Sequence, residues 1–368
     1  MLSTCDPELP EDVVIEILSR LPVKSLLRFK CVCKHWYTRT KKPSFIREHF
    51  NQENNQARLL VHHYDFDTDT YVVALFPDKT LKGMPSIHEE IDYLHIPPAM
   101  ETGIGSIDGL FFLHNGLDDN MALWNPATRE FRLLPAPHSI LPPYFSTIWH
   151  TFGYGLDNLA NIYKFIWIRS FWDEQMDNPY PSFVVAIYTL GSDSWRYLDP
   201  LELPNRAIHS SLCATYVNGA YYWLSSENGE NHSVLSLNMT SEVFREIQGP
   251  DHRKKTWVNL TLYNNGIALF LCQTDMVLQF IIDIWVMKEE GCWTKLLIVK
   301  PFPEILRPLG FWKSEDLLLE SGCLELVLYN HDTKETTGLG IYGFFTYCGL
   351  SIFSYKESLV SVKGQNED

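Results

Sequence analysis

The strongest constraint on the fold of this 368-residue chain is a pattern that recurs five times along the sequence. In each copy an apolar strand ends at a large residue, a polar turn follows, and a second strand begins about seven residues later. After a first step of 64 residues, the copies follow one another at 49, 48 and 44 residues, close to the roughly 40–50 residues of one propeller blade. The first anchors are Trp124, Tyr188, Leu237, Trp285 and Tyr329, and the second anchors are Phe131, Trp195, Phe244, Trp293 and Thr336.

A second hairpin precedes most copies of this pattern. The segments ATYVNGAYYWLSS and LTLYNNGIALFLC place Asn-Gly between two apolar strands, which is a strong signal for a tight turn. Two hairpins supply the four strands of a blade, and the long first step is interpreted as an inserted loop over Ser170–Phe183. Strands near 58–76 and 342–362 remain at opposite ends and are predicted to share a blade that closes the ring. We therefore predict an all-β, propeller-like domain of about six blades.

The first 50 residues follow a helical pattern instead. Apolar residues recur every four positions after Pro10, and Pro22 ends that stripe, as expected for a short amphipathic helix. A second helix fits VKSLLRFKCV, and a third fits residues 34–50 with an interruption at Pro43. Three short helices form a very small core, so apolar surface is left over. That surface either packs on the rest of the chain or docks on another protein.

Charge divides the chain at the same place. Residues 1–50 carry a net charge of +3 and residues 51–368 a net charge of −18. The predicted domains are therefore 1–50, a polar linker NQENNQA at 51–57, and the propeller at 58–368. The acidic balance of the large domain disfavours nucleic acid. The sequence lacks a secretory leader pattern and a run of about 18 apolar residues, which predicts a soluble protein of the cytoplasm or nucleus without a membrane partner.

The N-terminal segment resembles a plant F-box. LPEDVVIEILSRLPVKSLLRFKCVCKHW, followed by PSF and EHF, carries two Leu-Pro pairs and a KSLLRFKCVCK core in the expected order. The resemblance implies docking on a Skp-type adaptor and, through it, on the cullin and RING subunits of a ubiquitin ligase. Some of the implied contacts must also hold the three helices together. They are Leu9, Pro10, Ile17, Leu18, Leu21, Pro22, Leu26 and Phe29.

The larger domain resembles the kelch-like F-box-associated domain of the S-locus F-box group. The segments that carry the resemblance are LWNPATREFRLLP, FGYGLDNLANIYK, IWVMKEEGCWTKLL and PLGFWKSEDLLLE. The resemblance implies a substrate receptor for ubiquitin-dependent degradation. In self-incompatible plants, members of that group expressed in pollen recognise the basic ribonucleases of the style.

Catalytic patterns are absent from the sequence. It contains no Gly-x-Ser-x-Gly, no Walker loop and no His-Glu-x-x-His, and we expect neither a metal nor a cofactor. His62 and His63 are interpreted as a solvated strand end. The alternative to a non-catalytic receptor is a propeller enzyme, such as a hydrolase or cyclase, with the helices as a cap.

Acidic clusters occur where the repeat pattern predicts loops. They are YDFDTDT at 64–70, GLDDN at 116–120 and FWDEQMDN at 171–178. Each cluster alone is typical of a solvated loop. Together they are predicted to rim a face that captures a basic protein, with a stylar S-ribonuclease as the first candidate. The candidate substrate-binding residues are Phe171, Trp172, Asp173, Glu174 and Asp177.

Overall fold

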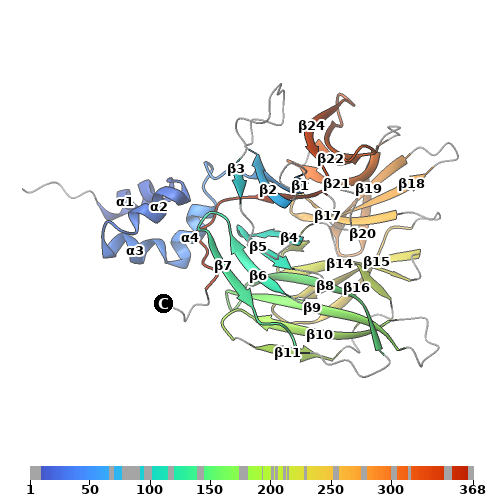
Figure 1. Ribbon diagram of the computed structural model, residues 1–368, viewed down its shortest axis with the longest axis horizontal. Coiled ribbons are helices and arrows are strands. Elements are labelled where there is room, and N and C mark those ends of the chain that lie inside the picture. The colour runs from blue at the N-terminus through green and yellow to red at the C-terminus, as the bar shows by residue number, and fades with distance from the viewer. Residues whose placement is uncertain are drawn as a thin grey trace, which may run out of the picture.

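In the computed structural model, a group of short helices projects from one side of a ring of β-sheets, with the last helix nearest the ring (Figure 1). The structure describes residues 10–65, 70–76, 92–94, 102–114, 120–138, 145–173, 181–192, 194–199, 203, 206–209, 213, 215–227, 230–251, 257–274, 280–299, 305–313, 316–343 and 350–363.

Four helices precede the first strand in the described part of the chain: α1 (Glu11–Ser19), α2 (Val23–Phe29), α3 (Lys34–Thr40) and α4 (Pro43–Phe50). Pro10 and Pro22 each stand directly before a helix, where a missing N–H costs nothing. Pro43 is the first residue of α4, so the third predicted helix is two helices separated at the predicted interruption. Their common core contains Leu18, Val23, Leu26 and Phe45.

The described strands form six sheets, which confirms the predicted propeller. Each sheet is numbered as a blade, with its strands given from the centre of the ring outward. Blade 1 contains β25 (Ser351–Tyr355), β1 (Arg58–Asp65), β2 (Thr70–Phe76) and β3 (Asp92–Leu94); blade 2 contains β4 (Thr102–Ile107), β5 (Leu110–His114), β6 (Met121–Asn125) and β7 (Glu130–Leu134); blade 3 contains β8 (Phe145–Asp157), β9 (Ile162–Asp173), β10 (Ser182–Thr189) and β11 (Trp195–Leu198).

The other three blades follow in chain order. Blade 4 contains β12 (Ala207–His209), β13 (Tyr216–Val217), β14 (Ala220–Glu227), β15 (Glu230–Asn238) and β16 (Phe244–Gln248); blade 5 contains β17 (Trp257–Tyr263), β18 (Gly266–Thr274), β19 (Phe280–Glu289) and β20 (Cys292–Val299); blade 6 contains β21 (Ile305–Trp312), β22 (Asp316–Ser321), β23 (Glu325–Asn330) and β24 (Thr336–Tyr342).

The ring closes by pairing the two ends of the propeller. β25 pairs antiparallel with β1, with Leu60 opposite Phe353, and this confirms the predicted shared blade. Successive residues of a strand point to opposite faces of its sheet. Leu60 accordingly packs towards blade 2, whereas Leu59 and Val61 pack towards blade 6. Similar apolar clusters join the remaining neighbours, so the core is a series of interfaces between blades.

The repeated anchors have a structural role. Trp124 pairs with Phe131, and the same pairing holds in blades 3, 4 and 6. In blade 5 a register shift places Trp293 opposite Met287 instead. The indole of Trp195 donates to the carbonyl of Pro135 at 2.6 Å, and that of Trp293 donates to the carbonyl of Gln248 at 2.8 Å. Each hydrogen bond connects a Trp of the outermost strand to a carbonyl at the end of the outermost strand of the preceding blade. Trp195 and Trp293 therefore also link neighbouring blades.

Two local expectations are wrong. The long first step does not come from an insertion over Ser170–Phe183, because β9 continues to Asp173 and β10 starts at Ser182. It comes largely from β8 and β9, which are 13 and 12 residues long. His62 is not solvated but 3% exposed in the middle of β1. Burial, with a smaller effect of His63, lowers the pKa of His62 to about 4.

Blade 4 departs from the regular pattern at the centre of the ring. Its inner edge is divided into β12 and β13, which both pair with β14. Between them, Cys213 packs against the cluster shared by blades 1 and 2, and its sulfur lies 3.8 Å from Oγ1 of Thr261 in blade 5. The chain of blade 4 therefore reaches across the axis of the ring.

Deleting residues 342–368 removes β25 and is expected to destabilise the whole propeller. The deletion removes the buried side chains of Ile352, Phe353 and Tyr355. Burial of each contributes about 1.5–3 kcal/mol to the free energy of unfolding. By the usual scaling for a domain of this size, Tm should fall by at least about 10 °C. Differential scanning calorimetry would measure the shift, with deletion of residues 364–368 as the control. A truncated protein with the Tm of the full chain would contradict closure by β25.

Candidate functional site

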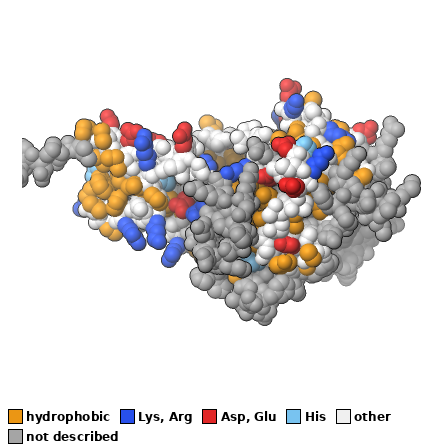
Figure 2. All heavy atoms as spheres, turned by 90° about the horizontal axis from the view of Figure 1, so that it is seen from above, with side chains coloured by type: hydrophobic (Ala, Val, Ile, Leu, Met, Phe, Trp, Pro, Cys, Tyr) orange, Lys and Arg blue, Asp and Glu red, His pale blue; other side chains and the backbone are white. Residues whose placement is uncertain are grey.

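Apolar side chains gather on the helical end of the molecule. Figure 2 shows them in orange over the helices, at the end away from the propeller. Val13 and Ile17 lie one turn apart on α1 and are 41% and 48% exposed, and Val32 and Tyr37 are also largely exposed. We call these four residues the helical apolar face. Because Leu18 points into the helical core, α1 carries apolar residues on two sides, of which only one is covered.

The structure divides the predicted adaptor contacts into three groups. Ile17 is exposed together with both prolines of the Leu-Pro pairs, Pro10 and Pro22. Leu21 and Phe29 are half-buried and pack against the helical core. Leu18 and Leu26 are 2% and 0% exposed and belong to that core. Leu9 lies outside the described residues.

Ion pairs on the surface orient the helical apolar face. Arg39 of α3 contacts Glu11 of α1 at 2.7 Å, and His35 lies 3.6 Å from the same carboxylate. Glu16 and Arg20 form a further pair at the end of α1. Exposed pairs of this kind contribute little stability each. The contacts of Glu11 do connect α1 to α3, the helices that hold Val13, Ile17 and Tyr37.

The predicted substrate-binding residues fall at the end of β9. Phe171 is half-buried in that strand, and the backbone of Trp172 and Asp173 continues it. Glu174 and Asp177 lie outside the described residues, as do most of the three acidic clusters. The strands that flank these clusters are described, and the clusters join β1 to β2, β5 to β6, and β9 to β10.

These three connections begin on one face of the ring. Each one joins the second and third strands of its blade, and the blades are consecutive. The turns on the other face contact the helical end: Ala127, between β6 and β7, packs against the helical core. Because neighbouring strands are antiparallel, the β5–β6 connection starts on the face opposite the helices.

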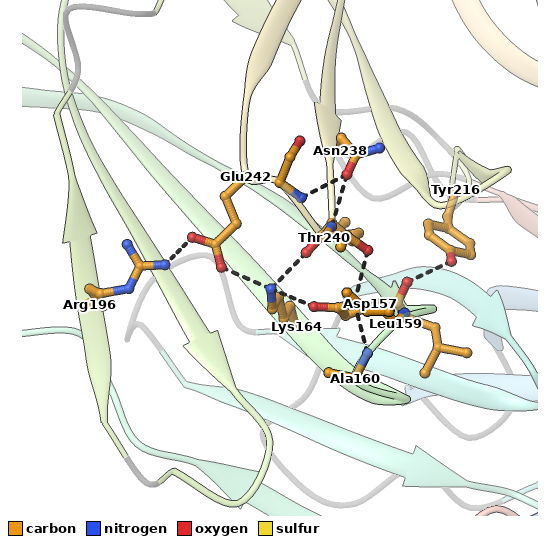
Figure 3. A network of polar contacts seen from close by, with 12 residues as sticks. Asp157, Leu159, Ala160, Lys164, Arg196, Tyr216, Asn238, Thr240 and Glu242 are labelled. Carbon is orange, nitrogen blue, oxygen red and sulfur yellow. Dashed lines mark hydrogen bonds and ion pairs between the residues drawn. The ribbon is translucent and has the colours of Figure 1, made fainter.

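A buried ionic cluster lies between blades 3 and 4 (Figure 3). Nζ of Lys164 lies 2.8 Å from Oδ2 of Asp157 and 2.9 Å from Oε1 of Glu242. The same ammonium donates to the carbonyl of Met239 at 2.7 Å, and Arg196 forms a second ion pair with Glu242. We call Asp157, Lys164 and Glu242 the interblade clamp. No pattern in the sequence predicts this cluster, although FGYGLDNLANIYK contains both Asp157 and Lys164.

The clamp is stabilised in its charged form. Burial alone would raise the pKa of Asp157, but hydrogen bonds from Lys164, the Ala160 N–H and Thr240 outweigh it and bring this pKa to about 2. Burial would lower the pKa of Lys164, yet its bonds to the two carboxylates raise it. Both groups therefore keep their charges near neutral pH, whereas a general acid or base needs a pKa close to the operating pH. The clamp is therefore suited to joining blades and not to acid–base catalysis.

The described segments contain neither a metal-binding cluster nor a membrane-spanning helix. No group of three or more His, Cys, Asp or Glu side chains there is placed to hold a metal ion. No helix in the described part of the chain is long and apolar enough to cross a membrane.

Comparison with known families agrees with this arrangement. Residues 7–48 match the model of the F-box domain, and residues 81–362 match that of the F-box associated beta propeller domain. The chain belongs to this family of F-box proteins. The four helices are thus its F-box, and the clamp lies in its F-box-associated propeller.

Related F-box proteins are known from Arabidopsis thaliana. The F-box/kelch-repeat protein At3g23880 is 27% identical over 88% of this chain and 87% of its own length. The putative F-box/kelch-repeat protein At1g12870 is 24% identical over 85% of this chain and 79% of its own length. Among solved structures, an oligogalacturonate lyase in complex with manganese matches 76% of this chain and 77% of its own, at 10% identity and a TM-score of 0.46.

Replacing the cation of the clamp is expected to destabilise the F-box-associated propeller. Lys164→Met leaves the buried Asp157 carboxylate without its cation and removes one of the two ion pairs of the half-buried Glu242, which should lower the free energy of unfolding by about 3–5 kcal/mol. Arg196→Met is the control because the Arg196 side chain is 59% exposed, and it should cost below about 1 kcal/mol. Urea unfolding at pH 7 measures the free energy of unfolding of both variants. If this free energy falls by the same small amount in both, the clamp does not hold blades 3 and 4 together.

Proposed function

We propose that this protein is the substrate-recognition subunit of an SCF-type ubiquitin ligase. The F-box docks on a Skp-type adaptor, which connects it to the cullin and RING subunits, and the propeller captures the target. The observation that carries this proposal is the helical apolar face, four exposed apolar residues of the F-box; Figure 2 shows apolar side chains gathered on this part of the molecule, at the end away from the propeller. Transfer of ubiquitin is assigned to the other subunits, and no catalytic step to this chain.

The adaptor contacts are proposed from exposure. Among the predicted contacts, Ile17 belongs to the helical apolar face, Pro10 and Pro22 are also exposed, and Leu21 and Phe29 are half-buried. Leu18 and Leu26 support this surface from the helical core. We also retain Leu9 as a proposed contact, because it directly precedes Pro10 in the sequence.

Ile17→Glu is expected to abolish adaptor binding without unfolding the F-box. The side chain is 48% exposed in the free protein, whereas an apolar interface would bury the new charge without a partner. We expect affinity for a plant Skp-type adaptor to fall at least about 100-fold, which corresponds to about 2.8 kcal/mol. Isothermal titration calorimetry measures it, and circular dichroism checks the fold.

Leu159→Glu is the matched control for this test. Leu159 is 85% exposed on the propeller, so the same charge is introduced at an exposed apolar residue outside the F-box. It should leave adaptor affinity unchanged. If Ile17→Glu binds like Leu159→Glu, the helical apolar face is not the docking surface.

For the substrate we propose a basic protein. Residues 51–368 carry a net charge of −18, which accelerates association with a basic partner. The three acidic connections of blades 1, 2 and 3 start on the face opposite the F-box. A target bound there leaves the adaptor surface free. The first candidate is a stylar S-ribonuclease, which would make the protein a pollen receptor of the S-locus group in self-incompatibility.

Binding of such a target should weaken as salt rises from about 50 to 200 mM, because exposed charges are screened over about 10 Å at 0.1 M. Neutralising Asp173, Glu174 and Asp177 together should lower mainly the association rate. Trp172→Ala should raise the dissociation rate, since Trp is enriched among interface hot spots. Surface plasmon resonance across a panel of S-ribonucleases measures both rates. Salt-independent binding, or binding to no member of the panel, would refute the basic-target proposal.

A further inference from the structure

The chain does not end when the ring is closed. After β25, residues Lys356–Lys363 return along the junction between the ring and the helices, where Figure 1 shows the red C-terminal segment beside α4 and β7. We call these eight residues the C-terminal strap. Leu359 is inserted into the core of the F-box, and Val362 is buried in the cluster of blades 2, 3 and 4. One short segment thus contributes to the cores of both parts.

Asn125, the last residue of β6, holds the strap. Its Nδ2 donates to the carbonyl of Ser358 at 3.1 Å and to that of Val360 at 2.7 Å. Its Oδ1 accepts the N–H groups of Ala127 and Thr128 in the following turn. The side chain is fully buried. All of its polar atoms are therefore used, half for the turn and half for the strap.

Close packing fixes the path of the strap on the ring. Gly109, in the turn between β4 and β5, has a φ of +78°. A Cβ at this position would lie 2.4 Å from Cβ of Ser358 and 2.7 Å from the carbonyl oxygen of Lys356. Only glycine allows this contact. The backbone N–H of Val362 also donates to Glu130 at 3.2 Å.

Further contacts join the strap to the segment that follows the F-box. Asn55 donates to the carbonyl of Glu357 at 2.9 Å, and Arg58 forms an ion pair with the Glu357 carboxylate at 2.7 Å. Nζ of Lys356 lies 5.7 Å from the centre of the Phe50 ring, at the end of α4. The strap therefore contacts the F-box, the linker and the propeller within eight residues.

From these contacts we infer that the C-terminal strap sets the distance and angle between the F-box and the propeller, with Leu359 and Asn125 as positioning residues for ubiquitin transfer. This inference rests on the proposed function. In that transfer a lysine amine attacks the ubiquitin thioester carried by the conjugating enzyme, an amide forms and the thiol leaves. The amine must be held near the thioester, so a fixed angle limits which lysines react.

The first test measures the distance between the two parts in the full-length protein. Spin labels are attached to Cys31 of the F-box and Cys323 of blade 6, which are both exposed, after Cys5, Cys33, Cys292 and Cys348 are changed to Ser. The parent protein should give one narrow distance distribution by double electron–electron resonance. Leu359→Ala and Asn125→Asp, which keeps the acceptor for the turn and removes the donor to the strap, should each widen it at least twofold.

Two control variants separate positioning from stability. Ser361→Ala changes an exposed residue of the strap and should leave the distribution narrow. Leu271→Ala creates a cavity in blade 5, far from the strap, and should lower Tm without widening the distribution. Distributions that stay narrow for both Leu359→Ala and Asn125→Asp would overturn the inference. This measurement needs no adaptor, so it stands even if the proposed function fails.

The second test reads the consequence for transfer. The full-length protein is assembled with adaptor, cullin and RING subunits, and its own lysines serve as acceptors that mass spectrometry identifies. The parent, Ser361→Ala and Leu271→Ala should give the same restricted set of modified lysines. Leu359→Ala and Asn125→Asp should bind the adaptor within about threefold of the parent and modify a wider set. An unchanged set would refute positioning for transfer, whereas a parent that fails to assemble would refute the proposed function instead.

Discussion

The pairing of β25 with β1 is the interaction on which the rest of the structure depends. A single blade cannot bury both of its apolar faces, so each one needs a neighbour on either side. Leu59 and Leu60, adjacent in β1, pack towards blades 6 and 2 respectively. In an open array, blade 1 and blade 6 would each have one apolar face without a neighbour. The position of the strap also follows from this pairing, because it continues directly from the closing strand.

Charged groups have two separate roles in this molecule. In the interblade clamp, Lys164 forms ion pairs with two carboxylates from different blades at a largely buried site and so joins those blades. The acidic connections of blades 1, 2 and 3 start on the opposite side of the ring. The charges of the clamp stabilise the fold, whereas we propose a role in recognition for the charges of these connections. The helical apolar face differs from both groups, because its exposed side chains are uncharged.

The sequence predicted the architecture because the repeat is local. Trp124 and Phe131 lie in one hairpin, so their spacing of seven residues is readable without a structure. Contacts between distant residues could not be read in this way. Glu242 of blade 4 forms an ion pair with Lys164 of blade 3. Leu359, near the C-terminus, packs into the core of the F-box. In the F-box, Leu18 and Ile17 are neighbours of the same apolar type, and only packing distinguishes core from surface.

Closure by the last strand also has a consequence for biosynthesis. Arg58 and Glu357, which meet beside the closing blade, are 299 residues apart. At about 5–20 residues per second, a ribosome needs about 15–60 s to connect them. During that interval the edge of β1 lacks its partner β25, and an unpaired strand edge can pair with other chains. A premature stop codon even a few residues before Ser351 would make this exposure permanent, so such an allele should yield an aggregating product and not a shortened receptor.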